Sequence, residues 1–299
     1  MQESRIQRLT EELKSTFFKE GDYQLCLEIG RVRLDIFTSS TATLKRMSEY
    51  FADFLSSGPA DASIYIRTLA PLDDLWEDDD AEFTVRGPLA FQRDFAAERI
   101  GPNQAVAVIA PGLDDAFHNL LRWYLPPFLL KKGCFLMHAA GVARKEAGAY
   151  RGYVFFGQSG AGKSTTAKLI SEADSSAVLL GDDGVIIGAT EDGKLFLYSA
   201  PLGCGYSRIA PPPLVVPLQG LFALEQSDHH EILDLAPSEG VAALLASAMS
   251  VRFSESIEER FQLSLQFSVE VKKIKFKKDA GFWSMVCLKG AGHEFSPEI

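Results

Sequence analysis

Residues 153–171 read Tyr153-Val-Phe-Phe-Gly-Gln-Ser-Gly-Ala-Gly-Lys-Ser-Thr-Thr-Ala-Lys-Leu-Ile-Ser171. The apolar run Tyr153–Phe156 predicts a buried strand, and the residues from Lys163 to Ser171 predict a helix. The turn between them, Gly157 to Ser164, matches the pattern GxxxxGK[ST] at every fixed position. Strand, glycine-rich turn and helix in this order predict an α/β domain built around a phosphate-binding loop.

Glycines in such a turn let the backbone curl so that successive N–H groups point inward and cradle phosphates, and the helix N-terminus adds partial positive charge. Lys163 is expected to reach the β- and γ-phosphates, and the Ser164 hydroxyl is expected to ligate Mg²⁺. The predicted ligand is ATP or another nucleoside triphosphate, with Mg²⁺. A glycine-rich turn that binds nothing is the alternative. The residues expected to contact the nucleotide are Gly157, Gln158, Ser159, Gly160, Ala161, Gly162, Lys163, Ser164 and Thr165.

A second apolar run, Ala177-Val-Leu-Leu-Gly-Asp-Asp183, ends in two carboxylates. Asp182 follows Lys163 by only 19 residues, a spacing that argues against a transport or recombination motor. One carboxylate can hold the metal while the other accepts a proton, and we assign Asp183 to the metal and Asp182 to the base. A bend at Gly181 or Gly184 is needed to aim both at one site. The alternative is a simple strand-ending turn.

Three motifs in order, His138-Ala-Ala-Gly-Val142, the glycine loop and Leu179-Leu-Gly-Asp-Asp183, resemble the catalytic domain of HPr kinase/phosphorylase. The sequence is more distantly similar to ATP-dependent phosphoenolpyruvate carboxykinase. The resemblance covers roughly residues 130–220. It implies a P-loop domain with a mixed, β-rich core, in which His138, Lys163, Ser164, Asp182 and Asp183 line one site.

Two departures bear on the substrate. Thr165 stands where HPr kinases carry glutamate, and their arginine- and asparagine-rich C-terminal signature is absent. The resemblance therefore points to a branch that phosphorylates a serine hydroxyl of a peptide, protein or small molecule rather than to HPr itself. A core histidine with no catalytic role is the alternative for His138.

The segment Ser199–Pro213 combines glycines, serines and a proline run. This composition predicts a mobile lid that closes over the nucleotide, with Arg208 reaching the phosphoryl group. An ordinary surface arginine is the alternative. His229-His230 and the acidic run Glu77–Asp80 are interpreted as solvated turns rather than metal sites.

The bulk composition limits the partners. The chain has 299 residues, 46% hydrophobic and 23% charged, and a net charge of −10. Its pI is near 5.1, which argues against nucleic acid or an anionic membrane as the main partner. The amphipathic N-terminus and the scattered cysteines predict a cytoplasmic protein with reduced thiols. An oligomer is left open.

The length predicts two domains: a small α/β domain of unknown role over residues 1–125 and the kinase-like catalytic domain over residues 126–299. Helices are predicted over 1–20, 44–55, 114–130 and 237–249. The remaining predicted elements are a hairpin at 25–36, strands at 63–67, 83–85, 105–109 and 220–224, a hairpin at 185–198, and a polar-faced strand over 271–278. Residues 135–142 are predicted as one β-rich run, residues 143–151 as a turn, and residues 280–285 as a tail that docks on the catalytic domain.

Three function hypotheses follow. The first is an ATP- and Mg²⁺-dependent kinase that phosphorylates an unidentified hydroxyl acceptor. The second is an ATP-binding sensor with little turnover that works through the N-terminal domain. The third, carboxykinase chemistry, requires a basic pocket for a dicarboxylate, which the sequence does not reveal.

Overall fold

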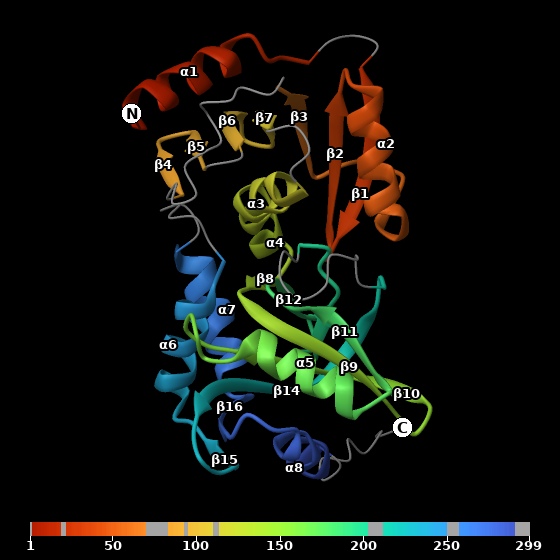
Figure 1. Cartoon of the computed structure of the whole chain (residues 1–299), viewed down its shortest axis with the longest axis vertical. Coiled ribbons are helices and arrows are strands. Elements are labelled where there is room, and N and C mark those ends of the chain that lie inside the picture. The colour runs from red at the N-terminus through yellow and green to blue at the C-terminus, as the bar shows by residue number, and fades with distance from the viewer. Residues whose placement is uncertain are drawn as a thin grey trace. The chain divides into compact units, whose positions relative to one another are not determined.

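The computed structural model of the chain describes residues 2–18, 22–69, 83–92, 95–109, 114–202, 212–249 and 257–290. It is a mixed α/β structure with two sheets (Figure 1). The described residues up to Lys132 form one compact unit, unit 1, and those from Gly133 onward form another, unit 2. The sequence placed this boundary slightly earlier, after residue 125, at a point that leaves helix α4 (Pro126–Lys131) outside unit 1.

Unit 1 is built on a seven-stranded sheet in the order β1-β2-β3-β7-β6-β5-β4. Pairing is parallel between β2 and β3 and between β3 and β7, and antiparallel elsewhere. The hairpin predicted at 25–36 is confirmed, and Gly30 turns it with a φ of 64°. The strands are β1 (Tyr23–Ile29), β2 (Val32–Thr38), β3 (Ala62–Thr68), β4 (Thr84–Arg86), β5 (Leu89–Phe91), β6 (Phe95–Gly101) and β7 (Gln104–Ile109).

Helices cover both faces of this sheet (Figure 1). On one face, Leu9 and Leu13 of α1 (Gln2–Lys14) pack in a core with Ala96 of β6. Because side chains alternate along a strand, Arg99 of β6 points to the other face. There its guanidinium lies over the Trp123 ring, 5.2 Å from the centroid. The remaining helices of the described part of unit 1 are α2 (Thr41–Tyr50), the 3-10 turn η1 (Ala52–Phe54), α3 (Asp114–Tyr124) and α4.

Unit 2 holds the second sheet, whose main path runs β11-β9-β10-β14-β13-β12-β8. The long strand β14 joins its two parts, because its first residues pair with β13 and its later ones with β10 and β16. β15 pairs with β16 at one side. The strands are β8 (Cys134–Met137), β9 (Ala139–Glu146), β10 (Ala149–Phe156), β11 (Ala177–Gly181), β12 (Val185–Ala189), β13 (Leu195–Tyr198), β14 (Val215–Gln226), β15 (Glu231–Asp234) and β16 (Val271–Phe276).

One core joins this sheet to helices α5 (Lys163–Ala173) and α8 (Gly281–Gly290). Phe155 of β10 stacks on Phe222 of β14, with ring centroids 5.5 Å apart, and Trp283 of α8 packs edge-on against Tyr153. The predicted docking of the 280–285 tail is therefore confirmed, as the first part of α8. Two further helices, α6 (Pro237–Ser247) and α7 (Ile257–Ser268), pack against each other in the same unit.

The β-rich run predicted at 135–142 is confirmed, but a bend at His138 divides it into two strands, β8 and β9. One sequence prediction in unit 2 was wrong. The predicted turn 143–151 is mostly strand, and only Ala147 and Gly148 make the turn, with φ angles of 46° and 89°. None of the described helices is long and apolar enough to cross a membrane.

Asp174, which ends α5, ties three elements together. Its carboxylate accepts hydrogen bonds from Arg144 Nε on β9 and Trp283 Nε1 on α8, both at 2.8 Å, and from the Ser176 amide at 2.9 Å. Burial raises the pKa of this carboxyl, but the hydrogen bonds from Ser176, Trp283 and Arg144 outweigh that effect and lower the pKa to about 2.

A lowered pKa makes the Asp174 contribution to stability present above the unfolded value of 3.8 and lost as pH falls through about 2. We expect Asp174→Asn to lower the free energy of unfolding by about 2 kcal/mol at pH 7, and the deficit to shrink below pH ~4. Urea unfolding of both proteins at pH 7, 4 and 3 measures this.

Asp192→Asn is the matched control. The pKa of Asp192 is also lowered to about 2, by hydrogen bonds from Lys194 and Thr190, but in an exposed hairpin. Because solvent screens that pair, we expect no measurable change in stability. Equal stability losses in the two variants would contradict the structural role of Asp174.

Candidate functional site

The candidate residues of unit 2 lie where three strands begin or end together. Phe156, the last residue of β10, pairs with Ala139, the first residue of β9. Gly181, the last residue of β11, pairs with Gly141 of β9. His138, the glycine loop and the aspartate pair each lie next to one of these paired positions. The sheet register therefore brings segments that are far apart in the sequence to one edge.

The strand, turn and helix predicted at 153–171 are present as β10, the loop 157–162 and α5. Gly160 and Gly162 have φ angles of 79° and 108°, which other residues rarely adopt. A Cβ built on Gly162 meets the Phe276 ring at 2.6 Å, so β16 packs directly against the loop. Gln158, Ser159 and Gly160 are exposed, as are Ser164 and Thr165 at the start of α5.

Lys163 is folded back onto the loop. Its side chain is buried, with 7% of the residue exposed, and Nζ donates to the carbonyl oxygens of Gly157 at 3.0 Å and Gln158 at 3.2 Å. Burial lowers the pKa of this amine, and the negative charge of Asp183 opposes that shift. The ammonium therefore bonds to the loop's own carbonyl oxygens. From this position it can bind an anion held in the loop instead.

His138 and Asp183 form a polar pair beside the loop. The Nε2 atom of His138 lies 2.8 Å from Oδ1 of Asp183, and 41% of the histidine side chain and 26% of the aspartate side chain are exposed. The bend between β8 and β9 carries His138, whose backbone N–H donates to Ser247 O at 2.8 Å. The structure thus brings His138, Asp183 and Lys163 into one electrostatic neighbourhood, because the charge of Asp183 acts on Lys163.

Asp182 differs from its neighbour. Only 2% of Asp182 is exposed, so an acceptor molecule has far less access to it than to Asp183. The bend expected at this point is present: β11 ends at Gly181, and residues 182 and 183 form a bend that leads into β12. A Cβ built on Gly181 would lie 2.2 Å from Gly184 O, so the bend requires glycine at 181.

We expect Gly181→Ala to lower the free energy of unfolding by about 3 kcal/mol, because the new methyl group meets backbone that cannot move aside without opening the bend. Gly184→Ala, in the same bend, is the control. Its added Cβ comes no closer than 3.4 Å to Leu202, so the expected loss is under about 1 kcal/mol. Urea unfolding measures the stability of both variants. Equal losses would show that the close approach of Gly184 O to position 181 does not determine the stability of the bend.

The lid prediction is corrected in part. Ser199, Ala200 and Leu202, at the start of the segment, are buried. The Ser199 amide donates to Leu214 O at 3.0 Å, and its hydroxyl also bonds Pro212 O. These residues follow directly on β13 and are part of the core. Residues 203–211, with Arg208, lie outside the described part of the chain, as does the acidic run Glu77–Asp80.

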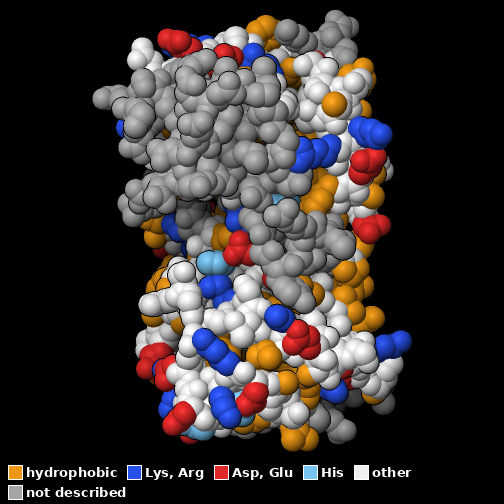
Figure 2. Space-filling model, in the orientation of Figure 1, with side chains coloured by type: hydrophobic (Ala, Val, Ile, Leu, Met, Phe, Trp, Pro, Cys, Tyr) orange, Lys and Arg blue, Asp and Glu red, His pale blue; other side chains and the backbone are white. Residues whose placement is uncertain are grey.

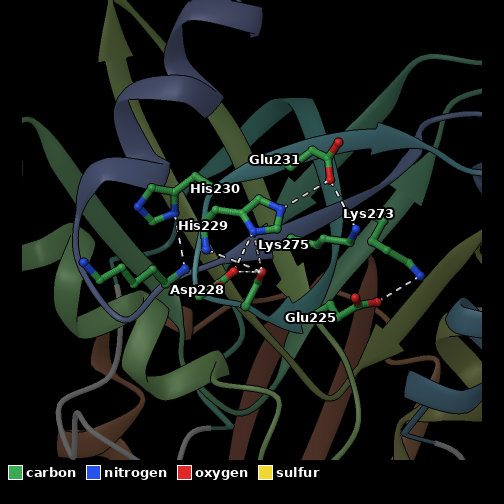
Figure 3. Close-up of polar contacts among 9 residues, drawn as sticks. Glu225, Asp228, His229, His230, Glu231, Lys273 and Lys275 are labelled. Atoms are coloured by element: carbon green, nitrogen blue, oxygen red, sulfur yellow. Dashed lines mark hydrogen bonds and ion pairs between the residues drawn. The ribbon is translucent and has the colours of Figure 1, made fainter.

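The turn at His229-His230 is held by contacts between the histidine rings and carboxylates (Figure 3). His229 Nδ1 lies 2.7 Å from Asp228 Oδ1, and His230 Nε2 lies 2.8 Å from Asp279 Oδ1. The hydrogen bond to Asp228 raises the pKa of His229. Among the described residues, no group of three or more His, Cys, Asp or Glu side chains is arranged to hold a metal ion.

Figure 2 shows one face of the molecule. On its described part in unit 2, Lys and Arg side chains are interspersed with Asp and Glu side chains. The ion pairs along β14, β15 and β16 fit this pattern, including Lys273 with Glu225 at 3.0 Å and Lys275 with Glu231 at 3.2 Å (Figure 3). That face therefore presents no continuous basic surface among the residues described.

Comparison of the chain with known protein families finds no match, and comparison with curated proteins likewise finds none. Its function is therefore inferred from the motifs and from the geometry of unit 2.

Proposed function

We propose that unit 2 is a P-loop kinase domain, similar to the HPr kinase and carboxykinase catalytic domains, that transfers the γ-phosphoryl group of ATP to a hydroxyl. The observation that carries the proposal is the convergence of Lys163, Asp183 and His138 on the exposed glycine loop. A loop that only turned the chain would not need a buried lysine aimed at its carbonyls or an acid–histidine pair beside it.

The donor set fits Mg²⁺ carried by a nucleotide. A magnesium ion in kinase sites takes one or two protein oxygens and completes its shell with phosphates and water. The exposed Ser164 hydroxyl and the Asp183 carboxylate can supply those oxygens. The absence of a three-ligand cluster among the described residues fits such a site better than an all-protein metal cage. When bound, Mg²⁺ would neutralise charge on the phosphates.

The burial of Asp182 changes which residue we assign as the base that accepts the hydroxyl proton. Asp182 is buried, whereas His138 is partly exposed and its Nε2 contacts Asp183. We therefore assign proton acceptance to His138 Nδ1, the ring nitrogen that does not contact Asp183. As the acceptor oxygen bonds to the γ-phosphorus, the bond from that phosphorus to the bridging oxygen of ADP breaks. The hydroxyl proton passes to Nδ1, and Lys163 balances charge on the phosphates.

Labelled ATP and Mg²⁺ offered with free serine, serine-containing peptides and simple alcohols test the proposal. The expected result is labelled acceptor, with ADP formed in equal amount. Tight Mg·ATP binding with no acceptor-dependent ADP would instead favour the sensor hypothesis. No binding of Mg·ATP by the folded protein would refute both.

A further inference from the structure

Gln226, the last residue of β14, contacts the glycine loop although it belongs to no sequence motif. Its side-chain Nε2 donates a hydrogen bond of 2.6 Å to Gly160 O. β14 runs parallel to β10 with Ala223 opposite Phe156, so residues 224–226 extend past the point where β10 turns into the loop. The last residues of β14 therefore lie alongside the glycine loop.

The backbone that presents Gln226 is firmly held. Gln226 pairs with Phe276 in the parallel register of β14 and β16, and the amide of the next residue, Ser227, donates to Phe276 O at 2.9 Å. Leu224 points to the same side of β14 as Gln226 and lies close to Gly157, where a built Cβ would be 3.7 Å from the Leu224 Cβ. The same strand face thus supports the loop near its start and at Gly160.

The space beside the Cα of Gly160 is open. The φ of this residue is 79°, and a Cβ built on it meets no atom within 4 Å. Because a peptide unit is planar, a hydrogen bond on Gly160 O fixes the direction of the Ala161 N–H as well. That N–H donates to Gln158 O at 3.0 Å in this structure. The bond from Gln226 is therefore a restraint from outside the loop on the peptide plane between Gly160 and Ala161.

We propose that Gln226 is a positioning residue that presets the phosphate loop for the nucleotide, an inference that rests on the function proposed above. An anion-binding loop works best when its N–H groups already point at the anion, because the ordering cost is then met before binding. Gln226 contributes to that order by a single hydrogen bond that holds the turn from Gln158 to Ala161, whose own N–H stays bonded to Gln158 O, and it touches no reacting atom.

Three variants test the inference. Gln226→Met keeps the length of the side chain but removes the donor, and Gln226→Lys restores a donor. Gln266→Met changes an exposed glutamine on α7 and serves as the control. Hydrogen exchange of the peptide spanning the loop is measured without nucleotide, and the Kd of Mg·ATP is measured by calorimetry. Repeating the measurement on Gln226→Lys in high salt separates the donor from the added charge.

We expect Gln226→Met to speed amide exchange in the loop, to raise the Kd about 5- to 10-fold, and to leave turnover at saturating ATP unchanged. Gln226→Lys should recover most of the affinity, also in high salt. Wild-type exchange and affinity in the Met variant would overturn the inference and leave the kinase proposal standing. A wild-type protein that binds no Mg·ATP would overturn the proposed function, and with it the nucleotide role of Gln226.

Discussion

Replacing Lys163 by alanine is expected to raise the Kd of Mg·ATP about 100-fold, with the fold intact. The ammonium lies within the loop, bonded to the Gly157 and Gln158 carbonyls, which are weaker partners than phosphate oxygens. In the alanine variant the Gln158 carbonyl can bond to water instead, because Gln158 is exposed and Gly157 is partly exposed. Calorimetry with Mg·ATP, together with a thermal melt, measures affinity and folding separately.

Lys168→Ala is the matched control. Lys168 lies on the same helix, but its side chain is exposed and pairs only loosely with Glu172, at 3.8 Å. We expect nearly wild-type affinity from it. A folded Lys163→Ala protein that binds Mg·ATP like the wild type would remove the loop from the site.

The pH dependence of binding adds a second readout. Because burial lowers the pKa of Lys163 from its ordinary value of 10.5, the amine loses its proton at a lower pH than an ordinary lysine does. Phosphate beside it favours the charged form, so nucleotide binding should raise this pKa. Affinity for Mg·ATP should therefore weaken as pH rises through the depressed value, and Lys163→Ala should lose that dependence.

The loop could be predicted from sequence because every constraint on it is local. The strand is a short apolar run, the positive φ angles need glycine, and the helix begins directly after the last glycine. The hairpin of β12 and β13 was predicted for the same reason, since a polar turn at residues 190–194 separates two apolar runs.

The bend at His138 could not be predicted from sequence, because it depends on distant pairings. β8 pairs with β12, whereas β9 pairs with β10 and β11, so the chain must change direction between two partners. An unbroken apolar run contains no sign of this. The charged residues after it suggested a turn, yet Arg144 and Glu146 stay in β9, where they pair with each other at 3.0 Å.

Helix α7 was missed although its signal was present. Ile257, Phe261 and Leu265 recur at helical spacing, but all three are exposed. The buried face of α7 carries Phe267 and two serines. The regularly spaced apolar residues therefore do not mark the face of the helix that is buried. The burial of Asp182 was equally hidden, because two adjacent aspartates look alike until the bend at Gly181 separates them.

Replacing His138 by alanine is expected to lower acceptor-dependent turnover about 10²–10⁴-fold, with little change in the Kd of Mg·ATP. The histidine contacts Asp183 at 2.8 Å but is not among the groups assigned to the phosphates. Asp183→Asn should differ, because it removes a metal oxygen with its charge. Both nucleotide affinity in the presence of Mg²⁺ and turnover should then fall.

Asp182→Asn separates this assignment from the one made on sequence alone. If His138 is the base, Asp182→Asn retains most of the turnover, and the large loss of turnover occurs in His138→Ala. If Asp182 is the base, the pattern reverses, and His138→Ala turns over nearly normally. Turnover in each variant is measured as labelled acceptor formed at saturating Mg·ATP, which keeps differences in binding out of the comparison. Normal turnover in all three variants would show that neither aspartate nor the histidine acts in the transfer, and the kinase proposal would fail.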